Sequence, residues 1–286
     1  MTNGRTPLIF YESVWLTEPE KINSMYYIGI DIGSLSCDGV IINDDLQICA
    51  ASVVPTGARN IEAIKRVKSD ILTRAGLTEQ DIRATVSTGY GRNRVEEKLA
   101  AVTEITCHAR GITHLFPDTR LLIDIGGQDS KTIRLDENGR VVDFAMNDKC
   151  AAGTGRFLEA MARALEVDID ELGHLDADAR ENLTLSSMCT VFAESEVVSL
   201  IANGVVVPEI ARGLHRAIAS RTISMVRRVV QDDIKQLSTA MSGGVARNPG
   251  VVRELAALLG TDIRVPEQPD IVGALGAALI AKERSG

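Results

Sequence analysis

Two cysteine-containing segments carry the residues best suited to chemistry in this chain of 286 residues. Cys150 precedes Gly153-Thr154-Gly155 and a predicted helix over about 153–165, and Cys189 precedes a predicted helix over 190–202. A helix N-terminus presents unpaired N–H groups and a partial positive charge, which stabilise a thiolate or an anionic metal cluster. A free cysteine more often packs as a small apolar side chain, and spacing alone favours that role for both.

Two cysteines cannot complete the four-thiolate set of an iron–sulfur cluster. A symmetric dimer would double two ligands to four, and one cluster on the two-fold axis would satisfy the chemistry. The remaining cysteines, Cys37, Cys49 and Cys107, lack a comparable context, and we expect the first two to be packing residues in or beside strands. No role in a site is expected for the four histidines.

Two turns combine an aspartate with glycines directly after apolar strands. Asp31 is followed by Gly33-Ser34, and Asp124 is followed by Gly126-Gly127-Gln128. A polyphosphate needs backbone N–H donors in tight turns, which favours glycine, and its Mg²⁺ needs carboxylate oxygens. Each turn therefore offers both ingredients of an ATP site.

A third apolar strand leads to Gly243-Gly244, where a sugar or base could approach the backbone closely, and then to Asn248, which is suited to cap the next helix. Any one of these turns is equally well explained by a hairpin or a helix cap, but three in this order predict a nucleotide site. The chain has no Gly-Lys dipeptide and hence no P-loop. No Gly-x-Gly-x-x-Gly follows a strand, which disfavours a Rossmann site.

Composition and charge exclude several classes of protein. The 31 basic and 39 acidic residues give a net charge of −8, and the basic residues are scattered, which disfavours nucleic-acid binding. No segment is long and apolar enough to span a bilayer, and the first residues lack the basic-then-apolar order of a signal peptide. Five cysteines at irregular spacing argue against a disulfide framework. We therefore expect a cytoplasmic protein.

The apolar periodicity predicts alternating strands and helices. Strands are expected over 26–31, 39–42, 47–53, 84–87, 121–125, 131–135, 141–145, 237–241 and 263–265, and helices over 60–75, 153–165, 190–202, 208–231, 249–259 and 270–282. The tripeptide Asp-Ile-Gly occurs at 31–33 and again at 124–126, each time closing an apolar strand and opening a hairpin. This domain-scale repeat predicts two related lobes that face each other across a nucleotide cleft.

Taken together, these motifs resemble the BadF/BadG/BcrA/BcrD ATPase family, whose members include 2-hydroxyacyl-CoA dehydratase activators and ATPase subunits of benzoyl-CoA reductase. The resemblance covers about residues 26–282 and is carried by segments 29–34, 87–93, 123–131, 146–157, 189–196 and 242–248. The two cysteine motifs are its most specific part, because sugar kinases and chaperone ATPases share the nucleotide turns.

The resemblance implies a two-lobed, actin-like α/β ATPase with the acetate/sugar kinase–Hsp70–actin fold. Residues 26–115 would form the first lobe, completed by a C-terminal helix over 270–286. Residues 116–269 would form the second lobe, which carries the cluster-ligand helices. Residues 1–25 form an extension outside the resemblance.

The resemblance also implies the site residues. Cys150 and Cys189 match the ligands of one [4Fe-4S] cluster shared by a dimer, formed with a second copy or with a paralogous subunit. Asp31 and Asp124 would orient Mg²⁺ and water, and by its chemistry Gln128 would position the attacking water. The residues that would contact ATP are Gly33, Ser34, Gly126, Gly127, Gly243, Gly244 and Asn248.

Proteins of this family take an electron from ferredoxin or flavodoxin. With ATP binding and hydrolysis they pass it to an iron–sulfur dehydratase or reductase that acts on CoA thioesters. One departure from the family pattern is Asp38, where several activators have lysine. An acidic residue near phosphates is unfavourable unless it faces Mg²⁺ or points away. Two alternatives on the same fold stay open: a small-molecule kinase, which needs a substrate pocket with a general base, and a cluster-free ATP-binding regulator.

Overall fold

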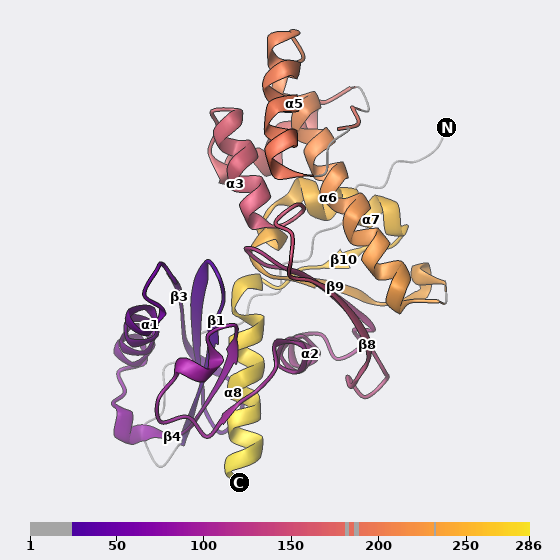
Figure 1. The fold of residues 1–286 in the computed structure, drawn as a ribbon. Coiled ribbons are helices and arrows are strands. Elements are labelled where there is room, and N and C mark those ends of the chain that lie inside the picture. Colours follow the sequence, from indigo (N-terminus) through magenta and orange to yellow (C-terminus); the bar gives the residue numbers. More distant parts are fainter. Residues whose placement is uncertain (1–24, 181–182, 186–188, 232) are drawn as a thin grey trace. The chain divides into compact units, whose positions relative to one another are not determined.

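The computed structural model describes residues 25–180, 183–185, 189–231 and 233–286 (Figure 1). The expected extension over 1–25 therefore lies, but for Met25, outside the described residues. The chain divides into two compact units. Among the described residues, one contains 25–119 with Leu135–Val142 and Pro266–Gly286, and the other contains Arg120–Arg134 with Asp143–Val265. We call them the first and second unit.

A mixed five-stranded sheet forms the centre of the first unit, with strand order β3-β2-β1-β4-β5. The strands are β1 (Tyr26–Ile32), β2 (Ser36–Ile42), β3 (Ile48–Pro55), β4 (Ile82–Gly89) and β5 (Ala100–Ala101). β1 pairs with β2 in antiparallel and with β4 in parallel orientation. Every residue of β1 is buried, which is why its sequence, apart from Asp31, does not alternate between apolar and polar residues.

Helices cover both faces of this sheet. α1 (Asn60–Ala75) packs on one face through an apolar stripe that includes Val67 and Ile71. α2 (Glu104–Leu115) and α8 (Val272–Ser285) pack together on the other face. Figure 1 shows α1 and α8 on opposite sides of β1. α1 ends where expected, because Gly76 adopts the left-handed conformation and donates its N–H to Thr73 O.

The second unit repeats this plan. Its sheet has the order β10-β9-β6-β7-β8. As in the first unit, the strand that comes first in the chain, β6, pairs with its hairpin partner β7 in antiparallel and with β9 in parallel orientation. The strands are β6 (Leu121–Ile125), β7 (Ser130–Leu135), β8 (Val141–Asn147), β9 (Thr239–Ser242) and β10 (Ile263–Arg264). The helices are α3 (Gly155–Ala164), α4 (Ile169–Leu175), α5 (Thr190–Ala202), α6 (Val207–Val229) and α7 (Pro249–Leu259). Leu121, Ile123 and Ile125 join these helices in one apolar core.

Most predicted elements match the structure, but two helices were not predicted. α2 contains Gly111 in its interior, a residue that lowers helix propensity, and the glycine is needed because a Cβ there would lie 2.1 Å from Val272 O of α8. α4 is a short helix of seven residues, and so short a segment shows too little periodicity to be recognised. Tertiary packing, rather than local sequence pattern, accounts for both.

Candidate nucleotide and cysteine sites

The first glycine turn joins β1 to β2. Gly33 N–H donates to Ser36 O at 2.9 Å, which closes the turn, and Gly91 N–H donates to Ile32 O at 3.1 Å. Asp31 is the last polar side chain of β1 before the turn and is buried. Ser34 lies in the turn itself.

The carboxylate of Asp31 lies in a space kept open by two glycines. A Cβ on Gly89 would lie 2.5 Å from Asp31 Oδ1, and a Cβ on Gly273, in the first turn of α8, would lie 2.0 Å from Oδ2. His108 Nε2 lies 3.5 Å from Asp31 Oδ2. Sequence reasoning gave no role to His108, Gly89 or Gly273, because the contacts come from elements far apart in the chain.

The second glycine turn joins β6 to β7 and has the same backbone closure, with Gly126 N–H donating to Asp129 O at 2.9 Å. Here the aspartate has partners for both oxygens. Lys131 Nζ lies 3.1 Å from Asp124 Oδ2 and 2.5 Å from Asp129 Oδ2, and Ser242 Oγ donates to Asp124 Oδ1 at 2.8 Å. All four side chains are buried, so this ion-pair cluster fixes Asp124 firmly.

The two turns are related by an internal repeat that extends beyond the Asp-Ile-Gly motif. Asp31 lies opposite Thr88 of the parallel strand β4, and Asp124 lies opposite Ser242 of the parallel strand β9. A glycine with positive φ ends β4 and another directly follows β9: Gly89 with φ 86° and Gly243 with φ 83°. A Cβ on either glycine would clash with the backbone of the neighbouring aspartate strand. Gly89 is thus the counterpart of the predicted site residue Gly243.

Asn248, predicted as a nucleoside-side residue and as a helix cap, does cap α7: its Oδ1 accepts from Val251 N–H at 2.9 Å. Its Nδ2 lies 3.4 Å from His215 Nε2, and His215 Nδ1 lies 3.0 Å from Asp176 Oδ2. His215 is fully buried. Burial alone would raise the pKa of Asp176, but the hydrogen bonds and charges of His215 and Arg253 outweigh it and lower that pKa.

The five cysteines fall into two groups. Cys37, Cys49 and Cys107 are buried, and burial raises the pKa of all three, that of Cys107 to about 12. Cys150 and Cys189 are exposed. The packing role that spacing alone favoured is therefore wrong for Cys150 and Cys189 and is confirmed for Cys37 and Cys49.

Only one of the exposed cysteines begins a helix. Cys189 is the N-cap residue of α5. Cys150, by contrast, lies in the loop between β8 and α3, because Gly153 turns the chain with φ 84° and the N-cap of α3 is Thr154. The expectation that Cys150 starts its helix is corrected accordingly.

The start of α3 is hydrogen-bonded to the second glycine turn. Gly155 N–H donates to Gly126 O and Arg156 N–H to Gly127 O, both at 2.9 Å. The hydroxyl of Thr154 lies 3.0 Å from Gly127 O and 2.6 Å from Ala151 O. The carbonyls of the predicted phosphate turn thus hold the segment that follows Cys150. Gln128, at the tip of the turn, is exposed.

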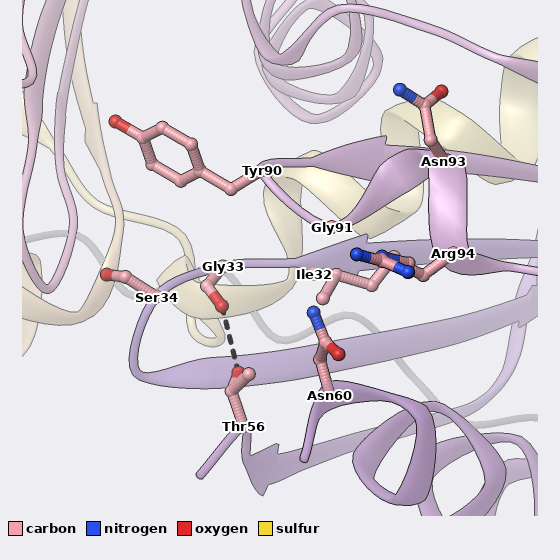
Figure 2. Close-up of a pocket in the computed structure, with 9 residues that line it drawn as sticks. All are labelled: Ile32, Gly33, Ser34, Thr56, Asn60, Tyr90, Gly91, Asn93 and Arg94. Carbon is pink, nitrogen blue, oxygen red and sulfur yellow. Dashed lines mark hydrogen bonds between the residues drawn. The ribbon is translucent and has the colours of Figure 1, made fainter. Parts of the chain in front are cut away.

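A polar pocket opens in the first unit beside the first glycine turn. Its lining residues come from that turn, the end of β3, the start of α1 and the loop after β4: Ile32, Gly33, Ser34, Thr56, Asn60, Tyr90, Gly91, Asn93 and Arg94. Figure 2 shows Asn60 and Arg94 beside Ile32 with their polar ends turned toward one another. Thr56 Oγ1 donates to Gly33 O at 2.9 Å, which anchors the turn to β3.

Within the described residues, no group of three or more His, Cys, Asp or Glu side chains is arranged to hold a metal ion. None of the described helices combines the length and apolar character needed to cross a membrane.

Comparison with known proteins agrees with this geometry. The model of the BadF/BadG/BcrA/BcrD ATPase family matches residues 28–281. The chain is 48% identical over 260 residues to the activator of lactoyl-CoA dehydratase from Anaerotignum propionicum, covering 91% of this chain and 98% of the relative. It is 35% identical over 219 residues to one of the subunits of benzoyl-CoA reductase from Thauera aromatica, covering 73% of this chain and 74% of that relative.

Solved structures agree on the fold. The activator of 2-hydroxyisocaproyl-CoA dehydratase from Clostridium difficile, solved with bound ADPNP, aligns with a TM-score of 0.85 at 44% identity, covering 91% of this chain and 96% of that chain. A ROK-family glucokinase from Streptomyces griseus aligns with a TM-score of 0.55 at 15% identity, covering 90% and 99%. The two-lobed, actin-like α/β fold predicted from the sequence is confirmed.

Proposed function

The chain belongs to the BadF/BadG/BcrA/BcrD ATPase family, and from that premise we propose that it is an ATP-driven activator of an iron–sulfur enzyme that acts on CoA thioesters. The activator relatives it resembles over nearly their whole length support this role. An electron taken from reduced ferredoxin or flavodoxin would pass to the partner enzyme, so that the donor loses one electron and the partner gains one.

The two glycine turns supply the contacts expected for ATP. Backbone N–H groups around Gly33 and Ser34 in the first unit, and around Gly126 and Gly127 in the second, are suited to phosphate oxygens. Gly243 and Gly244, with Asn248, would contact the nucleoside. We assign the two units to the two lobes of the ATPase.

Carboxylates beside the turns would bind Mg²⁺ and orient water. Asp31 and Asp38 lie directly opposite each other in the first hairpin and offer hard oxygen ligands. Asp124, held by Lys131, and the exposed Gln128 would orient the attacking water. In hydrolysis the water oxygen bonds to the γ-phosphorus, the bond to the β–γ bridging oxygen breaks, and phosphate and a proton leave with ADP.

The cysteine pair fits a shared [4Fe-4S] cluster. Cys150 and Cys189 are the two exposed cysteines, and they precede α3 and α5, which pack against each other. They would supply two of four thiolates, with the others from a second copy or a paralogous subunit. When bound, the cluster supplies a one-electron carrier. Val191 and Phe192, next to Cys189, are 68% and 67% exposed, which suits contact with another protein.

The observation that carries the proposal is the backbone link between nucleotide turn and cysteine loop. Gly126 O and Gly127 O accept hydrogen bonds from Gly155, Arg156 and Thr154, which directly follow the Cys150 loop. A shift of the turn when the γ-phosphate binds or leaves would displace those donors. Nucleotide state would in this way change the surroundings of Cys150, and hydrogen bonding and exposure set the reduction potential of a cluster.

Iron and acid-labile sulfide, measured on protein purified without oxygen, test the proposal. About four of each per dimer are expected, and the Cys150→Ala variant should lose both while still binding ADPNP. The matched control is Cys49→Ala, at a buried cysteine, which should keep the iron. A colourless wild-type protein that also resists reconstitution would favour the cluster-free regulator. The kinase alternative lacks support in the pocket of Figure 2, whose lining residues include no carboxylate or histidine to act as general base.

A further inference from the structure

We propose that the pocket of Figure 2 is a binding site for inorganic phosphate, with Arg94 and Asn60 as its principal ligands. The inference rests on the proposed function, because the phosphate would be the product released from ATP at the adjoining Gly33–Ser34 turn. Neither the family resemblance nor the repeat of the two turns assigns a ligand to Arg94 or Asn60.

The electrostatics of the pocket favour an anion. Arg94 is the one charged side chain among the nine lining residues, although the chain as a whole carries a net charge of −8. In the described part of the chain, Arg94 is exposed and has no ion pair or hydrogen bond through its guanidinium. Its five N–H donors in a planar fork match the oxygens of a phosphate.

The neighbouring basic residues make the contrast clear. Arg92 donates to Gly89 O at 3.1 Å, and Lys98 donates to Val95 O at 2.6 Å. These two side chains therefore stabilise the loop after β4 through backbone carbonyls. Arg94, two residues along from Arg92, instead lines the pocket.

The amide of Asn60 provides a second donor at the same end of the pocket. Asn60 is the first residue of α1, and its Nδ2 would lie 3.6 Å from a Cβ on Gly91, so the side chain reaches across to the loop after β4. In Figure 2 its amide and the Arg94 guanidinium are turned toward one another. Both groups can donate N–H hydrogen bonds into the space between them, and a phosphate has oxygens for both.

The position of the pocket fits a product site. Gly33 and Ser34 line its other end, so it adjoins the turn assigned to the ATP phosphates. Phosphate freed from ATP could therefore move along one continuous polar surface toward Arg94. Bound there, beside the γ-phosphate position, its negative charge would oppose entry of the next ATP by repulsion and slow turnover.

Calorimetric titration of the full-length protein with sodium phosphate, in parallel with ADPNP, tests the proposal. Arg94→Gln should raise the phosphate dissociation constant about tenfold or more, because it removes charge-assisted hydrogen bonds, and Asn60→Ala should raise it by a smaller factor. Arg94→Lys, which keeps the charge but loses the fork, should fall between wild type and Arg94→Gln. The matched control is Arg59→Gln, at the residue before Asn60. The Arg59 guanidinium is paired with Glu62 outside the pocket, so this variant should bind phosphate as wild type does.

Three outcomes would overturn the proposal: wild type that binds no phosphate, an Arg94→Gln variant with wild-type phosphate affinity, or an Arg94→Gln variant whose affinities for phosphate and for ADPNP fall by the same factor. The last would place Arg94 in the nucleotide site itself. Absence of ADPNP binding by wild type would instead refute the proposed ATPase function. The phosphate titration without nucleotide would still decide the pocket, so the two failures are distinguishable.

Discussion

Asp31 lies directly opposite Asp38 across the first hairpin, at the position where the second hairpin places Asp124 opposite Lys131. Side chains at directly opposed positions lie on the same face of a sheet with their Cβ atoms about 5 Å apart. The second turn thus contains a lysine beside its aspartate, whereas the first turn brings two buried carboxylates together, with His108 Nε2 3.5 Å from Asp31 Oδ2. Ser36 Oγ donates to Asp38 Oδ2 at 3.1 Å.

This asymmetry predicts that Mg²⁺ acts as the counter-charge of the first turn. Asp38→Lys should restore the pairing seen in the second turn and stabilise the metal-free protein by roughly 0.5–1 kcal/mol, because a like-charge pair becomes an opposite-charge pair. The same variant should lose the stabilisation that Mg²⁺ gives to wild type. Urea unfolding with EDTA and with Mg²⁺ measures both effects. Asp38→Asn is the control, because it removes the negative charge without adding a positive one. An Asp38→Lys protein that is less stable than wild type in EDTA would contradict the prediction.

A second prediction concerns the link between the nucleotide turn and the Cys150 loop. Thr154→Val removes the hydroxyl that contacts Gly127 O and Ala151 O. We expect a loss of about 1 kcal/mol in unfolding free energy and a roughly tenfold fall in electrons delivered per ATP hydrolysed, equivalent to about 1.4 kcal/mol of coupling. Parallel assays of phosphate release and partner reduction give this ratio. Thr154→Ser, which keeps the hydroxyl, should behave as wild type; an unchanged ratio in Thr154→Val would show that the link does not transmit nucleotide state.

A third prediction uses two glycines with the same φ. Gly243 has φ 83° and ψ 165°, a region essentially restricted to glycine, and a Cβ there would lie 2.4 Å from Ile125 O. Gly204 also has φ 83°, but a Cβ there would meet no atom within 4 Å. Gly243→Ala should therefore cost about 3 kcal/mol, from backbone strain and the clash together, and Gly204→Ala about 1 kcal/mol. Equal losses in denaturant unfolding would mean that the close approach to β6 is unimportant.

The sequence was sufficient to predict the fold because its strongest signals are local. Fully buried strands such as β1 are predominantly apolar, and the hairpin closures at Gly33 and Gly126 follow from short glycine turns next to aspartates. The Asp-Ile-Gly repeat identified the two related units for the same reason. The amphipathic face of α1 and the left-handed Gly76 at its end likewise depend on neighbours in the chain.

The features that were missed depend on contacts between distant segments. His108 approaches Asp31 from α2, and Gly273 makes room for the same carboxylate from α8. Neither residue has a local pattern that distinguishes it from a packing residue. The equivalence of Gly89 and Gly243 could have been found by extending the repeat to the strand parallel to each aspartate strand. The exposure of Cys150 is another tertiary property, since its local sequence fits a buried thiol equally well.

A fourth prediction separates the cysteines by reactivity. In protein freed of iron, a maleimide at neutral pH should modify Cys150 and Cys189 within minutes. Cys37 and Cys107 should remain unmodified, because burial blocks access and raises the pKa of both thiols, so that little reactive thiolate is present. Peptide mass spectrometry identifies the labelled sites, and labelling after unfolding in urea serves as the control for complete detection. Rapid labelling of Cys107 in the native protein would contradict its buried position.

A fifth prediction follows from the buried Asp176–His215 pair behind Asn248. The carboxylate of Asp176 accepts from His215 and is also paired with Arg253, and the backbone carbonyl of Asp176 accepts from Arg212. Asp176→Asn leaves Arg253 without its counter-charge and weakens the hydrogen bond to His215, and it should cost about 3 kcal/mol at pH 7. The pKa of Asp176 is lower in the folded than in the unfolded protein, so its stabilisation is complete above the ordinary value near 3.8 and is lost as the pH falls through the folded value.

The difference in unfolding free energy between wild type and Asp176→Asn should therefore stay large down to about pH 5 and shrink below about pH 4. Denaturant unfolding at a series of pH values measures this difference. Asp170→Asn, at an exposed position in α4, is the matched control and should show a small difference at every pH. Because His215 Nε2 faces the Asn248 amide, Asp176→Asn should also weaken nucleoside binding without changing phosphate affinity. A variant that loses stability yet binds ADPNP as wild type does would confine the pair to a structural role.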